Sequence, residues 1–169
     1  WTGGLTRMHF SPAAVWPVAA HGKVFITDPQ RAMTAINLET GETVWRTFQS
    51  MVRETIGLSA DKKRIYSKTM NDSVVCYSTI GDVPKKLWAS NVGFGYEHAP
   101  SMQMEKDGVV FSSTKEGLIF ALEASTGQVL WKHKIGNSLI NTVIPVSRHQ
   151  VLFTATGGEV GRLNCSPLP

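Results

Sequence analysis

Residues 121–131 read Ala-Leu-Glu-Ala-Ser-Thr-Gly-Gln-Val-Leu-Trp, and residues 35–45 read Ala-Ile-Asn-Leu-Glu-Thr-Gly-Glu-Thr-Val-Trp. Both stretches follow one pattern, Ala-apolar-x-x-x-Thr-Gly-x-x-apolar-Trp. A looser third copy begins at Cys76 and closes on Trp88, so the closing tryptophans Trp45, Trp88 and Trp131 are spaced by 43 residues. Self-similarity at a period in this range indicates a repeat architecture, in which each repeat is one supersecondary unit.

Within each period the sequence predicts four short β-strands joined by tight turns. Runs rich in β-branched and aromatic residues, such as residues 23–27 and 64–69, alternate with turns that contain glycine, proline or asparagine. Gly41 and Gly127 occupy the turn between the last two strands of a unit, where glycine can take the positive φ that tight hairpins require. No segment sustains a helical period for more than about two turns. The chain is therefore predicted to be all-β.

A four-stranded unit can bury both of its faces only by stacking against other units. Radial stacking of such units predicts a β-propeller of four-stranded antiparallel blades. In this interpretation Trp45, Trp88 and Trp131 dock each closing strand onto the adjacent blade, since a large aromatic side chain buries roughly 150–250 Å². The expected divisions are an outer strand of a preceding blade at 1–4, blades at 5–48, 49–90 and 91–135, and an incomplete last blade at 136–169. The second blade is expected to close with a strand over 86–90, and the first strand of the third blade is expected to begin at Gly93.

The repeated pattern resembles the tryptophan-docking motif of the pyrroloquinoline-quinone-like (PQQ-like) β-propeller repeats. These repeats occur in quinoprotein alcohol dehydrogenases and in the outer-membrane assembly lipoprotein of Gram-negative bacteria. The acidic third position of the motif is occupied here by Asn37 and Glu123, and by Ser78 in the degenerate copy. The resemblance implies a propeller fold and leaves the function open, because the repeat serves enzymes and scaffolds alike.

The resemblance also implies a ring of seven or eight blades, of which the sequence contains about four. Trp1 stands at the closing position of a repeat whose body is absent from the sequence. We therefore expect a piece of a larger propeller. Two alternatives stay open: a small ring closed by residues 1–3 pairing beside residues 159–164, and a ring of eight blades made by two chains.

Composition and charge narrow the classes of function. The chain has 17 Lys and Arg against 13 Asp and Glu, for a net charge of +4. The basic residues are scattered and no stacking aromatics interleave with them, so nucleic acid is not an expected partner. The apolar runs are far shorter than the ~20 residues that a transmembrane helix needs. Cys76 and Cys165 lack a metal-ligand spacing; Cys76 is expected to be a small buried thiol, and a disulfide between the two stays open.

A quinoprotein enzyme would need residues that the sequence does not contain. For such enzymes the resemblance implies two adjacent cysteines against the quinone, and a calcium ion held by carboxylate and amide oxygens. The chain has no adjacent cysteines, and no acidic loop that would offer the roughly six to eight oxygens that calcium prefers. PQQ and calcium are therefore disfavoured as cofactors, and the sequence assigns no catalytic or metal-binding residue.

One candidate site follows from a shared position in the repeat. Polar residues recur at or near the start of the first, innermost strand of successive units. They are expected to surround one mouth of the central channel, where propellers commonly bind their ligands. The six residues are His9, Arg53, Glu54, Glu97, His98 and Asn141. The alternative interpretation is a hydrated polar rim without a ligand.

The main functional hypothesis is a non-catalytic β-propeller module that binds a protein or another ligand. The family resemblance implies a periplasmic or cell-envelope location in a bacterium, with a protein or upstream propeller blades as the partner. Two alternatives come from other classes. One is part of a PQQ-dependent oxidoreductase whose cofactor residues lie on other blades, and the other is an accessory propeller domain of a larger hydrolase.

Overall fold

The computed structural model describes residues 17–96, 103–137 and 139–165. Every regular element in these ranges is a β-strand, which confirms the all-β prediction. The strands form four antiparallel sheets, and within each sheet consecutive strands are hydrogen-bonded neighbours. The first sheet consists of β1 (Val18–Ala20), β2 (Lys23–Thr27), β3 (Met33–Asn37) and β4 (Thr43–Thr47). The second consists of β5 (Val52–Leu58), β6 (Arg64–Thr69), β7 (Asn71–Ser78) and β8 (Lys86–Tyr96). The third consists of β9 (Met104–Lys106), β10 (Val109–Ser113), β11 (Leu118–Glu123) and β12 (Val129–Lys134), and the fourth of β13 (Ile140–Ser147), β14 (Gln150–Ala155) and β15 (Val160–Asn164).

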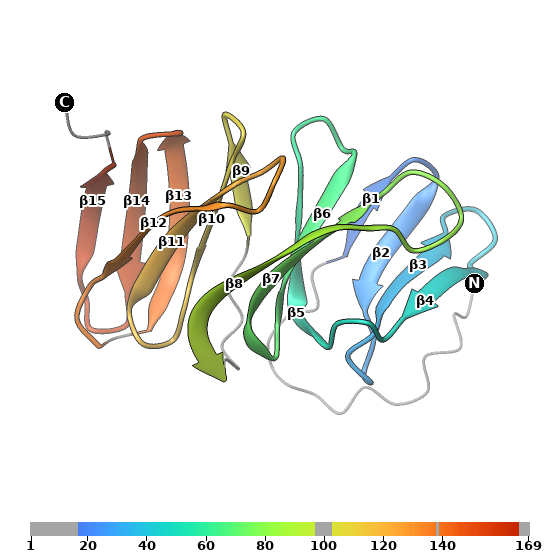
Figure 1. Ribbon diagram of the computed structural model, residues 1–169, viewed down its shortest axis with the longest axis horizontal. Helices are drawn as coiled ribbons and strands as arrows, with labels where there is room; N and C mark the ends of the chain where they lie inside the picture. The colour runs from blue at the N-terminus through green and yellow to red at the C-terminus, as the bar shows by residue number, and fades with distance from the viewer. Residues whose placement is uncertain (1–16, 97–102, 138, 166–169) are drawn as a thin grey trace.

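The four sheets stand side by side in chain order, with the first at the right and the fourth at the left of Figure 1. The first strands of the sheets take part in the contacts between neighbouring sheets: β5 contacts β1 and β2, β9 contacts β5, and β13 contacts β9 and β10. The first strands are the innermost strands of propeller blades. The first and fourth sheets lie at opposite ends of an open arc. Residues 1–3, for which the sequence offered a ring-closing pairing, lie outside the described residues.

The hydrophobic core is divided into three layers, one between each pair of neighbouring sheets. Phe25 and Trp45 of the first sheet pack with Ile56 and Tyr77 of the second. The second layer joins the second and third sheets, and the third layer joins the third and fourth sheets. Each sheet in the middle of the arc therefore buries both faces, as stacked blades are expected to do.

The closing strand of the second sheet is longer than expected. We predicted that it ends at Ser90 and that Gly93 begins the first strand of the third blade, but β8 continues to Tyr96, which pairs with Asn71 of β7. The expected division at residue 91 therefore falls inside a strand, and the described part of β9 is only Met104–Lys106. Gly93 and Gly95 have φ values of 76° and 75°. Such glycines bend a strand without ending its pairing, so the start of a new strand at Gly93 was wrongly predicted.

Each sheet has two ends that differ in what they carry. At one end the first strand begins, the second strand turns into the third, and the fourth strand finishes; we call it the entry end. At the other, the hairpin end, the third strand turns into the fourth through the Thr-Gly pair. Gly41 and Gly127 both have φ of 76°, as predicted for this turn. The hydroxyl of the preceding threonine accepts a hydrogen bond from the amide two residues later, at 3.2 Å in both copies.

Trp45, Trp88 and Trp131 lie on the closing strands of the first three sheets, toward the hairpin end. The indole Nε1 of Trp88 donates to the carbonyl of Ala124 in the third sheet at 2.9 Å. Its ring lies so close to Gly127 that a Cβ there would be 2.5 Å from the ring. Trp45 approaches Tyr77 of the second sheet with 6.2 Å between ring centroids. Trp131 packs against Phe111 of its own sheet and against the layer shared with the fourth sheet.

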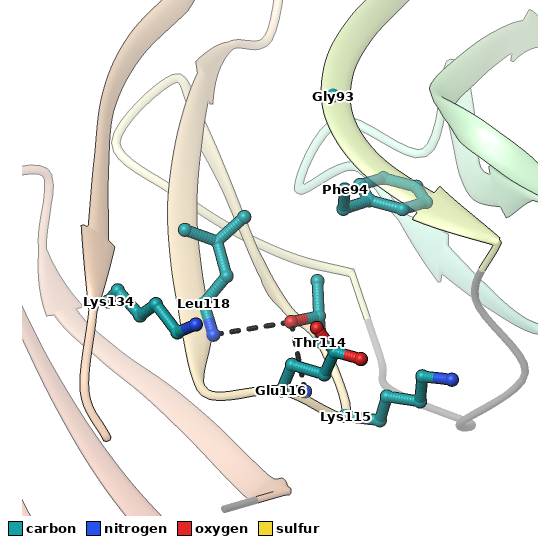
Figure 2. Close-up of a pocket in the computed structure, with 7 residues that line it drawn as sticks. All are labelled: Gly93, Phe94, Thr114, Lys115, Glu116, Leu118 and Lys134. Atoms are coloured by element: carbon teal, nitrogen blue, oxygen red, sulfur yellow. Dashed lines mark hydrogen bonds between the residues drawn. The ribbon is translucent and has the colours of Figure 1, made fainter. Parts of the chain in front are cut away.

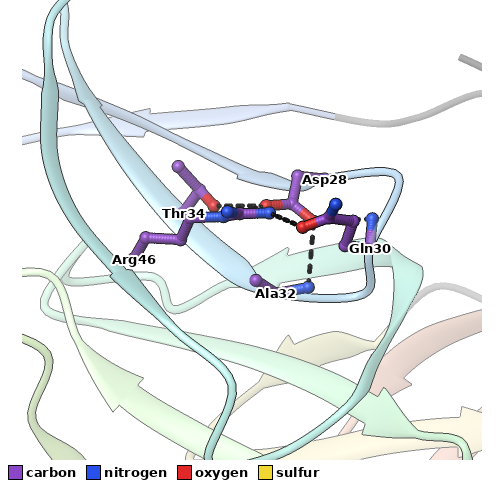
Figure 3. A network of polar contacts seen from close by, with 5 residues as sticks. All are labelled: Asp28, Gln30, Ala32, Thr34 and Arg46. Carbon is purple, nitrogen blue, oxygen red and sulfur yellow. Dashed lines mark hydrogen bonds and ion pairs between the residues drawn. The ribbon is translucent and has the colours of Figure 1, made fainter. Parts of the chain in front are cut away.

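A polar network fixes the turn between β2 and β3 (Figure 3). The buried carboxylate of Asp28 accepts hydrogen bonds from the amides of Gln30 and Ala32 and from the hydroxyl of Thr34. It also forms an ion pair with Arg46 of β4, which donates a second hydrogen bond to the side chain of Gln30 at 2.8 Å. Burial opposes ionisation of Asp28, but the hydrogen bonds from Arg46 and the two amides outweigh it and hold the pKa of the carboxyl below its usual value.

Candidate functional site

The structure describes the predicted channel-mouth residues only in part. Arg53 lies at the start of β5, and Glu54 and Asn141 lie on β5 and β13, although the side chains of the latter two are not described. His9, Glu97 and His98 lie outside the described residues. The grouping of these six residues around one channel mouth therefore stays a prediction.

Arg53 is buried, with 3% of its surface exposed. Its Nη1 donates to the sulfur of Met70 at 3.3 Å, beside the turn from β6 to β7. Its carbonyl accepts from the hydroxyl of Thr27 in the first sheet at 2.7 Å and from Ser67 at 3.2 Å. Arg53 therefore ties the first two sheets together at the entry end.

A second buried cation lies at the same end between the second and third sheets. Lys68 of β6 is fully buried, and its ammonium donates to the carbonyl of Ser113 in β10 at 2.8 Å. The same ammonium lies 5.9 Å from the centre of the Phe94 ring, within the range of a cation–π interaction. Phe94 in turn stacks on Phe120 of the third sheet, with 6.0 Å between centroids and 21° between planes. The extension of β8 thus lays its aromatic side chain across the boundary between two sheets.

Beside Phe94 the surface is hollowed, and the hollow has a volume of about 160 Å³. Three parts of the chain line it: the extension of β8, the turn from β10 to β11 and the end of β12 (Figure 2). The lining residues are Gly93, Phe94, Thr114, Lys115, Glu116, Leu118 and Lys134. We call this feature the entry-end hollow. Like Arg53, it lies at the entry end of the sheets.

Strand alternation explains why the hollow is apolar on one side and basic on the other. Leu118 and Phe120 point from β11 toward the second sheet and belong to the middle core layer. Their cross-strand partners on β12 are Lys134 and Lys132, so both lysines stand on that same face. Lys132 is fixed, because its ammonium donates to the carbonyl of Val92 in β8 at 2.9 Å. The apolar layer therefore ends in ammonium groups at its exposed rim.

The turn that forms the floor of the hollow is held from several directions. The hydroxyl of Thr114 accepts from the amides of Glu116 and Leu118 at 3.4 and 3.2 Å. Gly117 has φ of 83°, and a Cβ on it would lie 2.4 Å from the carbonyl oxygen of Ile135. The amide of Ile135 donates to the carbonyl of Gly117 at 2.7 Å. The floor of the hollow is thus preformed by these hydrogen bonds and close contacts.

The size and charge of the hollow decide what it can accept. Sites for cofactors and drug-sized ligands usually measure about 300–1,000 Å³, so 160 Å³ suits one side chain or a small group. The described residues of its walls carry two ammonium groups, on Lys115 and Lys134, and one carboxylate, on Glu116. In the described part of the chain no three His, Cys, Asp or Glu residues gather as they would around a metal ion. The hollow was not among the sequence predictions; an aromatic between two glycines, Gly93-Phe94-Gly95, was the available signal.

The two cysteines are free thiols. Cys76 is fully buried on β7, as expected, and burial raises the pKa of its thiol to about 12. Cys165 is partly exposed, and burial raises the pKa of that thiol as well. Neither thiol lines the entry-end hollow.

The open arc of four antiparallel sheets defines the class of fold, a β-propeller, and the repeated Thr-Gly…Trp pattern is similar to that of PQQ-like repeats. More particularly, residues 82–165 match the family model of the outer membrane protein assembly factor BamB. This match contains every residue of the entry-end hollow. Among curated proteins no match in sequence is found.

Solved structures show the same fold. BamB from Moraxella catarrhalis aligns with a TM-score of 0.69 and 13% identity over 89% of this chain and 44% of that one. The computationally designed protein Ika4 aligns with a TM-score of 0.72 and 16% identity over 98% and 100%. Hydrazine synthase from Kuenenia stuttgartiensis aligns with a TM-score of 0.66 and 13% identity over 85% and 43%. The chain thus spans less than half the length of the BamB that it resembles. No helix in the described ranges has the length and apolar character to cross a membrane.

Proposed function

We propose that the chain is a non-catalytic propeller module that binds a protein partner in a bacterial cell envelope. One observation carries the proposal: the half of the chain that matches the BamB family model, residues 82–165, also builds the preformed entry-end hollow. Propellers use the loops at one end of the ring for binding, because the sheets behind those loops form a rigid scaffold. The hollow offers an aromatic wall and a basic rim to such a partner.

Photo-crosslinking in the cells that produce the natural protein tests this proposal. A photoreactive amino acid replaces Lys115 at the rim of the hollow, and a matched variant carries it in place of Asp82, whose side chain is 89% exposed on the turn between β7 and β8 at the hairpin end. We expect the Lys115 variant to give one discrete protein adduct that excess unmodified chain suppresses, and the Asp82 variant to give none. Equal adducts from both positions, or none from either, would contradict a binding role for the entry end.

We also propose that the protein is located in the periplasm or the cell envelope and that it binds no PQQ or calcium. Fractionation of the natural host should recover the protein with the periplasm or the envelope, and recovery in the cytoplasmic fraction would reject the location. Isothermal titration with PQQ and with Ca²⁺ should show no saturable binding. A stoichiometric isotherm for either one would favour the quinoprotein alternative.

A further inference from the structure

We infer that the entry-end hollow binds an acidic peptide segment of the partner, with an apolar side chain on Phe94 and Leu118 and a carboxylate at Lys134. The inference rests on the proposed function and specifies the chemistry of its partner. The hollow has the volume for one such side chain, at about 160 Å³. Phe94 is partly exposed, and its ring and the side chain of Leu118 both line the hollow, from two neighbouring sheets (Figure 2).

The charges around the hollow favour an acidic partner. Lys115 and Lys134 belong to its lining, and Figure 2 shows the ammonium of Lys134 directed toward its centre. The ammonium of Lys68 lies over the Phe94 ring, and the ammonium of Lys132 of β12 donates to the carbonyl of Val92 in β8. Among the described residues of the lining, Glu116 is the one that carries a carboxylate. A carboxylate beside an apolar group meets complementary potential here, whereas a basic peptide would meet like charges.

The backbone of the β8 extension argues for side-chain insertion over strand addition. A peptide that adds a strand needs a regular edge with evenly spaced amides and carbonyls. Gly93 and Gly95 both adopt positive φ, the carbonyl of Val92 already accepts from Lys132, and the amide of Gly95 already donates to Asp72. The edge is therefore interrupted where the hollow opens. Because this edge cannot accept an added strand, we expect the peptide to bind by inserting a side chain into the hollow.

The preformed floor of the hollow lowers the entropic cost of peptide binding. Thr114, Gly117 and Ile135 fix the turn by hydrogen bonds and close backbone contact before any ligand arrives. A site whose groups are already ordered loses less conformational entropy on binding. We therefore expect small shifts of the floor on binding and larger changes at the lysine side chains.

Titration of the 169-residue chain with synthetic peptides tests the inference. The probes are acetylated, amidated peptides of alternating glutamate and leucine, glutamine and leucine, and lysine and leucine. Amide NMR shifts report where and how tightly each binds. We expect the glutamate peptide to shift the amides of Gly93, Phe94 and Lys115, to bind more tightly than the glutamine peptide, and to weaken as salt rises, because salt screens exposed charges.

Two variants with the same charge change separate the hollow from the overall charge. Lys134→Gln should weaken the glutamate peptide about fivefold, the upper range for one exposed ion pair, and should leave the glutamine peptide unaffected. Lys63→Gln, at the turn between β5 and β6 of the hairpin end, should change neither. Equal thermal unfolding of both variants verifies that each is folded.

The result that overturns the inference is equal binding of the glutamate and glutamine peptides, shifts that map to other sheets, or equal effects of Lys63→Gln and Lys134→Gln. Failure here is distinguishable from failure of the proposed function. If the Lys115 photo-adduct forms while the acidic peptide does not bind, the partner is real and its chemistry was wrongly inferred. If neither is observed, both proposals fall.

Discussion

Replacing Gly127 by alanine should destabilise the chain by about 2–5 kcal/mol, and two separate costs make up this figure. Gly127 has φ of 76°, a region that costs an L-residue roughly 1–2 kcal/mol. The new Cβ would lie 2.5 Å from the Trp88 ring, where carbon atoms prefer about 3.5–4.0 Å. Trp88 must then withdraw by about 1 Å, which breaks its hydrogen bond to the carbonyl of Ala124. Leaving a buried donor unpaired costs about 1–3 kcal/mol.

Gly81 supplies the matched control, because it is the equivalent glycine of the degenerate copy. It has φ of 86°, and a Cβ there would meet nothing within 4 Å. Gly81→Ala should therefore cost only the backbone term, about 1–2 kcal/mol. Urea unfolding followed by circular dichroism gives both free energies, provided the slopes agree between variants. The difference between the two measures the contact with Trp88.

A double-mutant cycle with Trp88→Ala tests whether the extra cost of Gly127→Ala comes from the Trp88 ring. In a Trp88→Ala background the ring is gone, so the extra cost of Gly127→Ala over Gly81→Ala should disappear. If Gly127→Ala and Gly81→Ala cost the same in the unmodified chain, the close approach of Trp88 does not stabilise the fold. If the extra cost persists without the ring, its origin lies elsewhere.

Three further outcomes follow from the buried contacts. Gly57→Ala should unfold or severely destabilise the chain, because a Cβ there would lie 2.0 Å from the carbonyl oxygen of Gln103, where the second and third sheets meet; a Tm within a few degrees of the unmodified chain would contradict this. Asp28→Asn should cost about 1–3 kcal/mol through loss of its charge-assisted hydrogen bonds. The pKa of Asp28 in the folded chain lies below 3.8. The carboxylate therefore stabilises the fold above about pH 4, and this stabilisation is lost as the pH falls through the folded pKa. In Asp28→Asn, the free energy of unfolding should accordingly depend less on pH in this range. Thiol titration at pH 8 should modify Cys165 first and Cys76 only on unfolding, since burial raises the pKa of Cys76 to about 12; equal rates would show that β7 opens readily.

Features encoded within one hairpin were predictable from the sequence. The Thr-Gly pair gave the turn, and Gly41 and Gly127 adopt the positive φ expected of them. The contribution of threonine was missed, although its hydroxyl accepts the same local hydrogen bond in both copies. That bond joins residues two apart, so a pattern of neighbours carries the information.

Features that depend on a neighbouring sheet were not predictable. Glycine marks both turns and bends within strands, and only the pairing of Tyr96 with Asn71 shows that β8 continues through Gly93. The burial of Arg53 likewise depends on contacts with Thr27 and Met70, which no periodicity reveals. The repeat phase placed Arg53 at the start of β5 but could not show whether its side chain faces solvent.

The entry-end hollow illustrates the same limit for a site. Phe94, Leu118 and Lys134 come from three separate elements of two sheets. Leu118 and Lys134 each read as an ordinary strand residue, one apolar and one exposed. Their convergence follows from the register that pairs β11 with β12 and from the bend in β8. Each strand can be predicted from the sequence, whereas the site depends on how the sheets stack.

The hairpin end and the entry end of the sheets therefore differ in their contribution to stability. At the hairpin end, Trp88 and Gly127 lock one sheet onto the next through contacts that tolerate no added atom. At the entry end, Phe94 and Leu118 of the hollow pack against the middle core layer, whereas the charged residues Glu116 and Lys134 are exposed. Substitutions such as Lys134→Gln should then alter binding at almost constant stability, because surface changes away from packed contacts usually stay within about 0.5 kcal/mol. This separation lets one motif preserve the fold while the opposite loops change partner, which is how a single repeat can serve proteins of unrelated function.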